Sequence, residues 1–204
     1  MHRGRLLVIS GPSGVGKGSI CKKVIEKKKD DVEYSISMTT RPPREGEVDG
    51  ENYFFVTTEE FKKKIEENGF LEHARVFKNY YGTPRANVME KLKAGRDVIL
   101  EIDIQGAMNI KKAYPEGIFI FILPPSMAEL RKRITGRGTE SESVIELRLG
   151  EALKEISYLD KYDYCVVNED LDEAAENVIA IITAEHSKVT ENIYDMIDKY
   201  KEEI

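Results

Sequence analysis

The sequence predicts an α/β domain with a parallel sheet of five strands flanked by helices. Apolar runs bounded by turn residues predict the strands, at about residues 5–10, 33–37, 97–102, 117–123 and 163–167. Segments of helical period lie between these runs, at about residues 17–29, 104–113, 126–135 and 141–158. Strands alternating with helices are typical of a parallel sheet covered by helices, and 204 residues are enough to bury its core.

The stretch from about residue 38 to residue 95 has a different pattern. Its segment "YFFVTTEEFKKKIEENGFLEHARVFKNYYGTP" alternates short aromatic strands with one charged helix. This pattern predicts an antiparallel insertion carried on the main sheet. From Leu171 onward the apolar residues recur every three or four positions, so one or two helices are expected to close the chain.

Composition limits the classes of partner. The 31 Lys and Arg residues are interspersed with 37 Asp and Glu residues, which gives a net charge of −6. This balance argues against a nucleic-acid or membrane-surface protein but allows a locally basic pocket for an anionic small molecule. The N-terminal stretch "MHRGRLLVIS" has too short an apolar run for a signal peptide or a membrane span, so a cytoplasmic location is expected.

Cysteine and histidine spacing predicts neither a disulfide framework nor a metal site. Cys21 and Cys165 are far apart in the sequence, and the three histidines are equally scattered. We expect free thiols and histidines that are solvated or hydrogen-bonded locally, and we assign no direct protein ligand to a metal.

A glycine-rich stretch between the first strand and the first helix predicts a phosphate-binding loop. Glycines allow backbone N–H groups to approach phosphate oxygens, Lys17 adds a positive charge, and the helix adds the positive end of its dipole. The alternative is a strand-to-helix turn with an incidental lysine. The predicted triphosphate-binding residues are Gly11, Pro12, Ser13, Gly14, Val15, Gly16, Lys17, Gly18 and Ser19.

Gly18 departs from the usual form of such loops, in which a Ser or Thr after the lysine binds magnesium. This departure disfavours a generic ATPase or GTPase. It fits the nucleoside monophosphate kinases, in which the metal can rest mainly on phosphate oxygens and water. Whether Ser19 contributes to magnesium binding is left open.

The insertion contains a second candidate anion site. Arg41 and Arg44 lie three residues apart around a Pro-Pro corner, so that two guanidinium groups can point at one anion. Tyr53 and Tyr81 can add hydroxyl donors. The alternative is a solvated turn beside an ordinary strand face.

Five segments together resemble the guanylate kinases, in order and at matching separations: "SGPSGVGKG", "TTRPPREGEVDGENYFF", "FLEHARVFKNYYGTP", "EIDIQGA" and "RGTESE". The resemblance covers roughly residues 5 to 186. It implies phosphorylation of GMP, and of dGMP, by ATP with Mg²⁺. It also implies the P-loop nucleoside monophosphate kinase fold, with a core of residues 1–37, 96–135 and 159–204, a GMP-binding insertion of residues 38–95 and a mobile lid of residues 136–158.

The resemblance also implies roles for individual residues. The base of GMP would contact Ser37, Glu72, Thr83 and Asp103, and its phosphate would contact Arg41, Arg44, Tyr53 and Tyr81. Physical chemistry supports Glu72, because a carboxylate can accept from both N1–H and N2–H₂ of guanine but would meet the bare N1 acceptor of adenine.

Arginines surround a glycine-bracketed segment between Gly136 and Gly138, which predicts a part of the chain that can open and close. By the resemblance, the catalytic set that stabilises the transferred phosphoryl group consists of Lys17, Arg44, Arg133, Arg137 and Arg148. Arg131 matches no arginine of the family and is expected to be solvated.

Three features of the sequence differ from the family pattern or match it only in part. Asn168 matches a residue placed beside the adenine of ATP, but the Asp that should follow it is Glu169. Glu101 stands where many relatives have Asp. The tail beyond His186 is longer than in those relatives and is expected to pack on the core, although a dimer contact, and so a homodimer instead of a monomer, stays open.

Two other functions compete with this interpretation. Guanylate-kinase-like domains exist that bind protein partners and have lost catalysis, but the presence of Lys17, Arg44, Arg137 and Arg148 argues against such a module. A kinase for another monophosphate is the second alternative, and the pair Glu72 and Ser37 argues against adenine.

Overall fold

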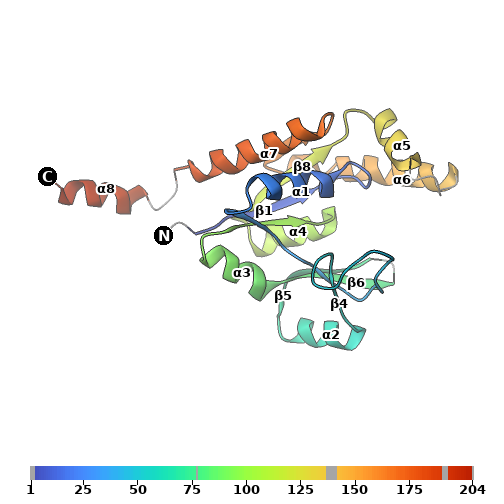
Figure 1. The fold of residues 1–204 in the computed structure, drawn as a ribbon, viewed down its shortest axis with the longest axis horizontal. Helices are drawn as coiled ribbons and strands as arrows, with labels where there is room; N and C mark the ends of the chain where they lie inside the picture. The colour runs from blue at the N-terminus through green and yellow to red at the C-terminus, as the bar shows by residue number, and fades with distance from the viewer. Residues whose placement is uncertain (1–2, 77, 137–141, 190–192, 204) are drawn as a thin grey trace.

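The computed structural model describes residues 3–76, 78–136, 142–189 and 193–203. Its centre is a sheet of five parallel strands, which confirms the predicted fold class (Figure 1). In spatial order the strands are β2 (Val32–Tyr34), β7 (Asp97–Glu101), β1 (Leu6–Ser10), β8 (Ile118–Leu123) and β9 (Tyr164–Val167). β2 is shorter than expected and ends at Tyr34 instead of about residue 37.

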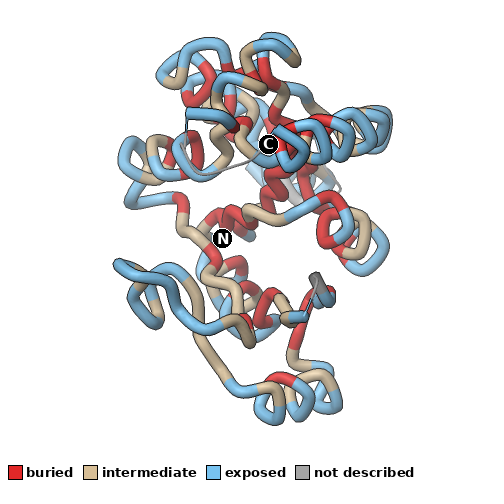
Figure 2. Tube along the Cα trace, turned by 90° about the vertical axis from the view of Figure 1, so that its right-hand side faces the viewer, coloured by how far each residue is buried: buried red, intermediate tan, exposed pale blue. Residues whose placement is uncertain are grey.

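Helices cover both faces of this sheet. All five residues of β1 are buried, and because side chains alternate along a strand, Leu7 and Ile9 face one side while Leu6 and Val8 face the other. The first face packs against α1 (Lys17–Lys27) and α7 (Leu171–His186). The second face packs against α3 (Arg85–Lys93) and α4 (Ile104–Ala113). Figure 2 shows the buried residues along the inner sides of these elements.

A second sheet holds four short strands below the central one in Figure 1. In order they are β4 (Phe54–Phe55), β3 (Met38–Thr39), β6 (Asn79–Pro84) and β5 (Phe70–Val76). The pairs β3–β6 and β5–β6 are antiparallel as predicted, whereas β3 and β4 are parallel, so the sheet is mixed and mostly antiparallel. The chain between β3 and β4 forms a loop instead of a tight hairpin, so the two strands can run in the same direction.

The insertion contains two helices, where the sequence predicted one. The expected charged helix is α2 (Thr58–Glu66), which begins at a capping box of Thr57 and Glu60 and buries Phe61. The second helix, α3, buries only Val88 and Leu92, and two buried positions four residues apart give a weak helical period. Both side chains join Leu6 and Val8 in one buried cluster, so α3 packs on the central sheet.

Two further helices pack together at one end of the molecule. They are α5 (Met127–Thr135) and α6 (Glu142–Ile156), and Leu130, Ile134 and Ile145 lie in their shared cluster. Arg131 is solvated as expected, with 39% of its side chain exposed, and it also donates hydrogen bonds to Glu142 and Glu146 of α6.

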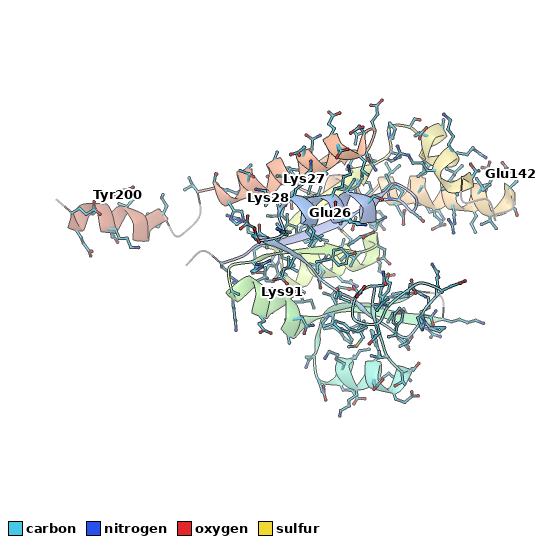
Figure 3. All side chains as sticks on the ribbon, in the orientation of Figure 1. Glu26, Lys27, Lys28, Lys91, Glu142 and Tyr200 are labelled. Atoms are coloured by element: carbon cyan, nitrogen blue, oxygen red, sulfur yellow. The ribbon has the colours of Figure 1, made fainter. Side chains whose placement is uncertain are left out.

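The C-terminal tail only partly follows the prediction. A short 3₁₀ helix (Leu159–Lys161) precedes β9, and α7 then packs on the core, whereas the expectation of core packing concerned the tail beyond His186. α8 (Ile193–Glu202) lies apart from the central sheet in Figure 1, and Figure 3 labels Tyr200 on this helix. Tyr194 is 70% and Tyr200 63% exposed. Tyrosine tolerates this exposure because its hydroxyl can face water.

Other expectations concern thiols, histidines and membranes. Cys21 is buried and Cys165 exposed, and both are free thiols as predicted. Nε2 of His186 lies 2.7 Å from Oδ2 of the buried Asp97, a local hydrogen bond that ties the end of α7 to β7. Within the described ranges, no helix has the length and apolarity needed to span a membrane.

The packing of α3 leads to a prediction about stability. Leu92→Ala should lower the free energy of unfolding by about 2–5 kcal/mol, because Leu92 is fully buried against the central sheet. The neighbouring exposed residue supplies the control, since Lys93→Ala should change the same quantity by less than about 0.5 kcal/mol. Urea denaturation of both variants measures this, and equal effects would show that α3 does not belong to the core.

Candidate nucleotide-binding site

The loop between β1 and α1 is pressed against other parts of the protein. Gly11 has φ +148°, and a Cβ atom there would lie 2.3 Å from the carbonyl oxygen of Ile122 in β8. Gly16 has φ +96°, and a Cβ atom there would lie 2.5 Å from Nδ2 of Asn168, just after β9. Both positions therefore require glycine for the fold of the loop itself, in addition to any need for phosphate access.

Asn168 forms hydrogen bonds that connect this loop to the end of β8. Its side chain is buried and donates a hydrogen bond of 2.7 Å from Nδ2 to the carbonyl oxygen of Val15. Its backbone N–H donates to the carbonyl oxygen of Leu123 at the end of β8. The structure thus gives Asn168 a role in fixing the loop, and its predicted contact with adenine stays a prediction.

Lys17 begins α1 and folds back over the loop. Its Nζ donates to the carbonyl oxygens of Gly11 at 2.6 Å and Pro12 at 3.0 Å. Burial lowers the pKa of Lys17, while the negative charges of Glu101 and Glu155 oppose this shift. The ammonium group therefore lies at the centre of the loop, among carboxylates that favour its charged form.

Glu101 lies close to position 18. A Cβ atom at Gly18 would lie 3.3 Å from Oε2 of Glu101, which is closer than side chains normally pack. The hydroxyl of Tyr34 donates to the same oxygen at 2.8 Å and fixes the carboxylate there. A Ser or Thr at position 18 would therefore require the carboxylate at the end of β7 to shift by a few tenths of an ångström. Ser19 follows on the exposed side of the helix.

The donor set near Lys17 fits magnesium only together with a bound phosphate. No group of three or more His, Cys, Asp or Glu side chains that could hold a metal is found among the described residues. Glu101 and Asp103 nevertheless line one cavity with Lys17. Mg²⁺ is usually bound through one or two carboxylates, water and substrate phosphates, so these two carboxylates suit an ion whose remaining ligands come from a nucleotide.

A cavity of about 290 Å³ lies between the loop, the end of β7 and the second sheet. It brings together residues that are far apart in the sequence and that were predicted to act in one site. Its lining consists of Gly11, Ser13, Lys17, Ser37, Tyr53, Glu72, Ala74, Tyr81, Gly82, Glu101, Ile102, Asp103, Gly106 and Glu155.

Glu72, from β5, is one of the few buried carboxylates among the described residues. Only 8% of the residue is exposed, and the hydroxyl of buried Thr83 donates to Oε1 at 2.9 Å. Burial raises the pKa of Glu72 to about 7, and the hydrogen bond from Thr83 acts in the opposite direction. Asp103 caps α4 by accepting from the N–H of Gly106 at 2.7 Å, so one of its oxygens is already used.

Arg41 and Arg44 lie on one turn, but their side chains do not have the same surroundings. The guanidinium group of Arg41 donates to Glu47 Oε1 at 2.8 Å and to the carbonyl oxygen of Pro42 at 2.7 Å. It also stacks 5.6 Å from the ring centre of Tyr53, which lines the cavity. Arg44 is exposed. Glu47 was not among the predicted site residues, and it is one of several acidic residues in the polar segment around the turn.

The arginines predicted in the lid have different places in the structure. Nη1 of Arg133 lies 3.5 Å from the carbonyl oxygen of Val15, which brings α5 to the loop. Arg148 is half-buried on α6. Arg137 belongs to the segment 137–141, outside the described residues.

Glu155, also on α6, lines the cavity and was missed by the sequence analysis. Burial raises its pKa, and the charge of Lys17 opposes that shift. In the sequence it is one of several glutamates on a charged helix, with no local signal that separates it from the others.

The site combines a glycine-rich loop and a lysine with a carboxylate-lined cavity that the second small sheet borders. These features define the class of P-loop nucleoside monophosphate kinases. Within that class, the chain belongs to the guanylate kinase family, whose model matches residues 3–185. This result confirms the resemblance seen in the sequence.

Curated relatives and a solved structure match over nearly the whole chain. The guanylate kinase of Caldanaerobacter subterraneus subsp. tengcongensis is 58% identical, over 98% of this chain and 97% of the relative. That of Clostridioides difficile is 52% identical, over 100% and 99%. The crystal structure of guanylate kinase from Anaplasma phagocytophilum superposes with a TM-score of 0.79 at 36% identity and covers 97% of this chain and 95% of its own.

The contact between Gly16 and Asn168 generates a prediction. Gly16→Ala should lower the free energy of unfolding by about 1–3 kcal/mol, because alanine would adopt a left-handed conformation and press on Asn168. Gly150→Ala is the matched control, since that glycine lies in α6 with nothing within 4 Å of an added Cβ atom, and it should stabilise by about 0.4–1 kcal/mol. Thermal and urea unfolding measure both, and a neutral Gly16→Ala would contradict this account of the loop.

Proposed function

We propose that this chain transfers the terminal phosphoryl group of ATP to the phosphate of GMP, and of dGMP, to give GDP or dGDP. Membership of the guanylate kinase family supports the reaction. The observation that carries the choice of base is the buried pair of Glu72 and Thr83 at the cavity.

Guanine fits this pair because its Watson–Crick edge presents N1–H and N2–H₂ side by side. The Glu72 carboxylate can accept from both, while Ser37 and Asp103 provide further polar partners at the same cavity and buried Thr83 holds Glu72 by donating to Oε1. Adenine would place a bare acceptor against the carboxylate and leave it unpaired. A site of this kind can reject the wrong base by as much as about 10⁴–10⁵-fold.

The phosphate of GMP would lie between the second sheet and the loop, held by Arg41, Arg44, Tyr53 and Tyr81. Arg41 and Tyr53 are already stacked, and the rings of Tyr53 and Tyr81 lie 6.1 Å apart, edge to face. Their hydroxyl groups and the guanidinium N–H groups are the donors that a phosphate dianion accepts best.

The loop from Gly11 to Ser19 would hold the phosphates of ATP, with Lys17 on the terminal ones and Asn168 toward the adenine. Phosphoryl transfer needs the acceptor oxygen in line and the charge of the transferred group offset, so this chain contributes position and positive charge. No strong base is required, because the GMP phosphate is already an anionic nucleophile. Mg²⁺, when bound, would offset charge on the phosphate oxygens beside Glu101, because Asp103 is assigned to the base.

Arg44 and the lid arginines Arg133, Arg137 and Arg148 would complete the positive surroundings of the transferred group. Within this proposal, residues 38–95 bind GMP and residues 136–158 act as the lid, which would close over the site and exclude water. The cytoplasmic location and the choice between monomer and homodimer stay predictions.

A panel of acceptors tests this function. Purified enzyme with ATP and Mg²⁺ should release ADP rapidly with GMP and dGMP, and far more slowly with AMP or UMP, in a coupled assay. Lys17→Ala is the control that ties the activity to this chain, and it should lose at least about 10³-fold in turnover, by analogy with other residues that stabilise the transferred group. A preference for AMP or UMP would overturn the guanine assignment, and no activity with any acceptor would favour a non-catalytic binding module.

The pKa of Glu72 gives a second prediction. Because the carboxylate must be ionised to accept from guanine, lowering the pH from about 8 to about 6 should raise the KM for GMP by roughly tenfold, following the fraction ionised around a pKa of about 7. The phosphate of GMP also titrates in this range, so the comparison is with Glu72→Gln, which binds more weakly and lacks the titrating group. If wild type and Glu72→Gln show parallel pH profiles, the carboxylate does not read the base.

A further inference from the structure

We propose that Glu47 is a positioning residue that holds Arg41 and the turn of Arg44 in the arrangement that binds the acceptor phosphate. The inference rests on the proposed function, because it takes these two arginines as the phosphate donors. Nothing in the family match or in the sequence pattern assigned Glu47 a role.

The carboxylate of Glu47 uses its two oxygens for two different parts of the turn. Oε1 accepts from Nη2 of Arg41 at 2.8 Å, and Oε2 accepts from the backbone N–H of Arg44 at 2.7 Å. The backbone N–H of Glu47 in turn donates to the carbonyl oxygen of Arg44 at 3.1 Å. The turn from Arg44 to Glu47 is therefore closed by two hydrogen bonds, both made through Glu47.

This arrangement fixes a side chain that would otherwise be free to rotate. The side chain of Arg41 is only 12% exposed and that of Glu47 only 20%. The guanidinium group also lies 5.6 Å from the ring centre of Tyr53 and 5.8 Å from that of Phe55. An arginine has five N–H donors, and Glu47 and Pro42 accept from two of them here, so three remain for a phosphate and for Tyr81.

Preorganisation is the expected benefit. If the turn became ordered only when the ligand binds, the free energy of ordering would weaken binding. The apparent affinity is proportional to the fraction of molecules that are already in the binding conformation. The rest of the loop is hydrogen-bonded as well, since Asn52 and Asp49 accept from backbone N–H groups at 2.8 Å each. Glu47 is the member of this set that reaches an arginine side chain.

In the opposite role, the Glu47 carboxylate would occupy the position of the GMP phosphate and compete with it. Such a stand-in would lie between both guanidinium groups. Glu47 instead contacts one guanidinium and a backbone amide, and it makes the turn. These contacts favour support of the site over competition for it.

The test compares two ligands that differ only in the phosphate. Glu47→Ala should raise the Kd for GMP about tenfold or more and leave the Kd for guanosine unchanged, both measured by calorimetry or by competition. In the kinetics, the KM for GMP should rise with little change in the KM for ATP. Glu47→Gln keeps one oxygen acceptor and should fall between wild type and Glu47→Ala. Glu45→Ala removes an exposed charge two residues away and should bind both ligands as wild type does.

Several results would overturn the inference. Equal weakening of GMP and guanosine by Glu47→Ala, with a lowered melting temperature, would show a purely structural role. Tighter binding of GMP would show that Glu47 competes with the phosphate. Arg44→Ala distinguishes failure of this inference from failure of the proposed phosphate site. If Arg44→Ala selectively weakens the binding of GMP while Glu47→Ala does not, only the inference about Glu47 fails. If neither variant affects GMP, the proposed phosphate site fails as well.

Discussion

The site depends on how tightly the loop between β1 and α1 is held by the rest of the core. Gly11 lies against β8, Gly16 lies against Asn168, and the amide of Asn168 bonds to the loop carbonyl at Val15. These contacts come from strands on one side of β1, so the order of the sheet sets the loop conformation. Lys17 and the start of α1 then have a fixed position relative to every other residue of the cavity.

This constraint gives the glycines two roles at once. A loop that binds phosphate must expose backbone N–H groups, and a loop packed between a strand end and Asn168 has no room for side chains at the same positions. Gly18 adds a third case, because Glu101 and Tyr34 occupy the space beside it. A Ser or Thr at this position would therefore crowd the Glu101 carboxylate.

The sequence was sufficient for the parts of the fold that local patterns encode. Fully buried strands gave continuous apolar runs, and all five parallel strands were predicted. α3 was missed because two buried residues, Val88 and Leu92, make too weak a period. Glu47 and Glu155 were missed for a different reason. Their roles depend on distances across the turn and between helices, and a charged residue in a polar segment carries no local signal of such a contact.

The distribution of charge around the cavity determines how a nucleotide can enter it. Among the described residues, four carboxylates line it, Glu72, Glu101, Asp103 and Glu155, together with the single ammonium group of Lys17. A phosphate placed at the Glu72 end would meet a buried carboxylate and no cation, and like charges in a buried site repel strongly. The same end suits a base edge rich in N–H donors. Under the proposed function, a monophosphate would therefore be held with its base against Glu72 and its phosphate toward Lys17 and the arginine-bearing turn, which is the orientation that transfer from a bound triphosphate requires.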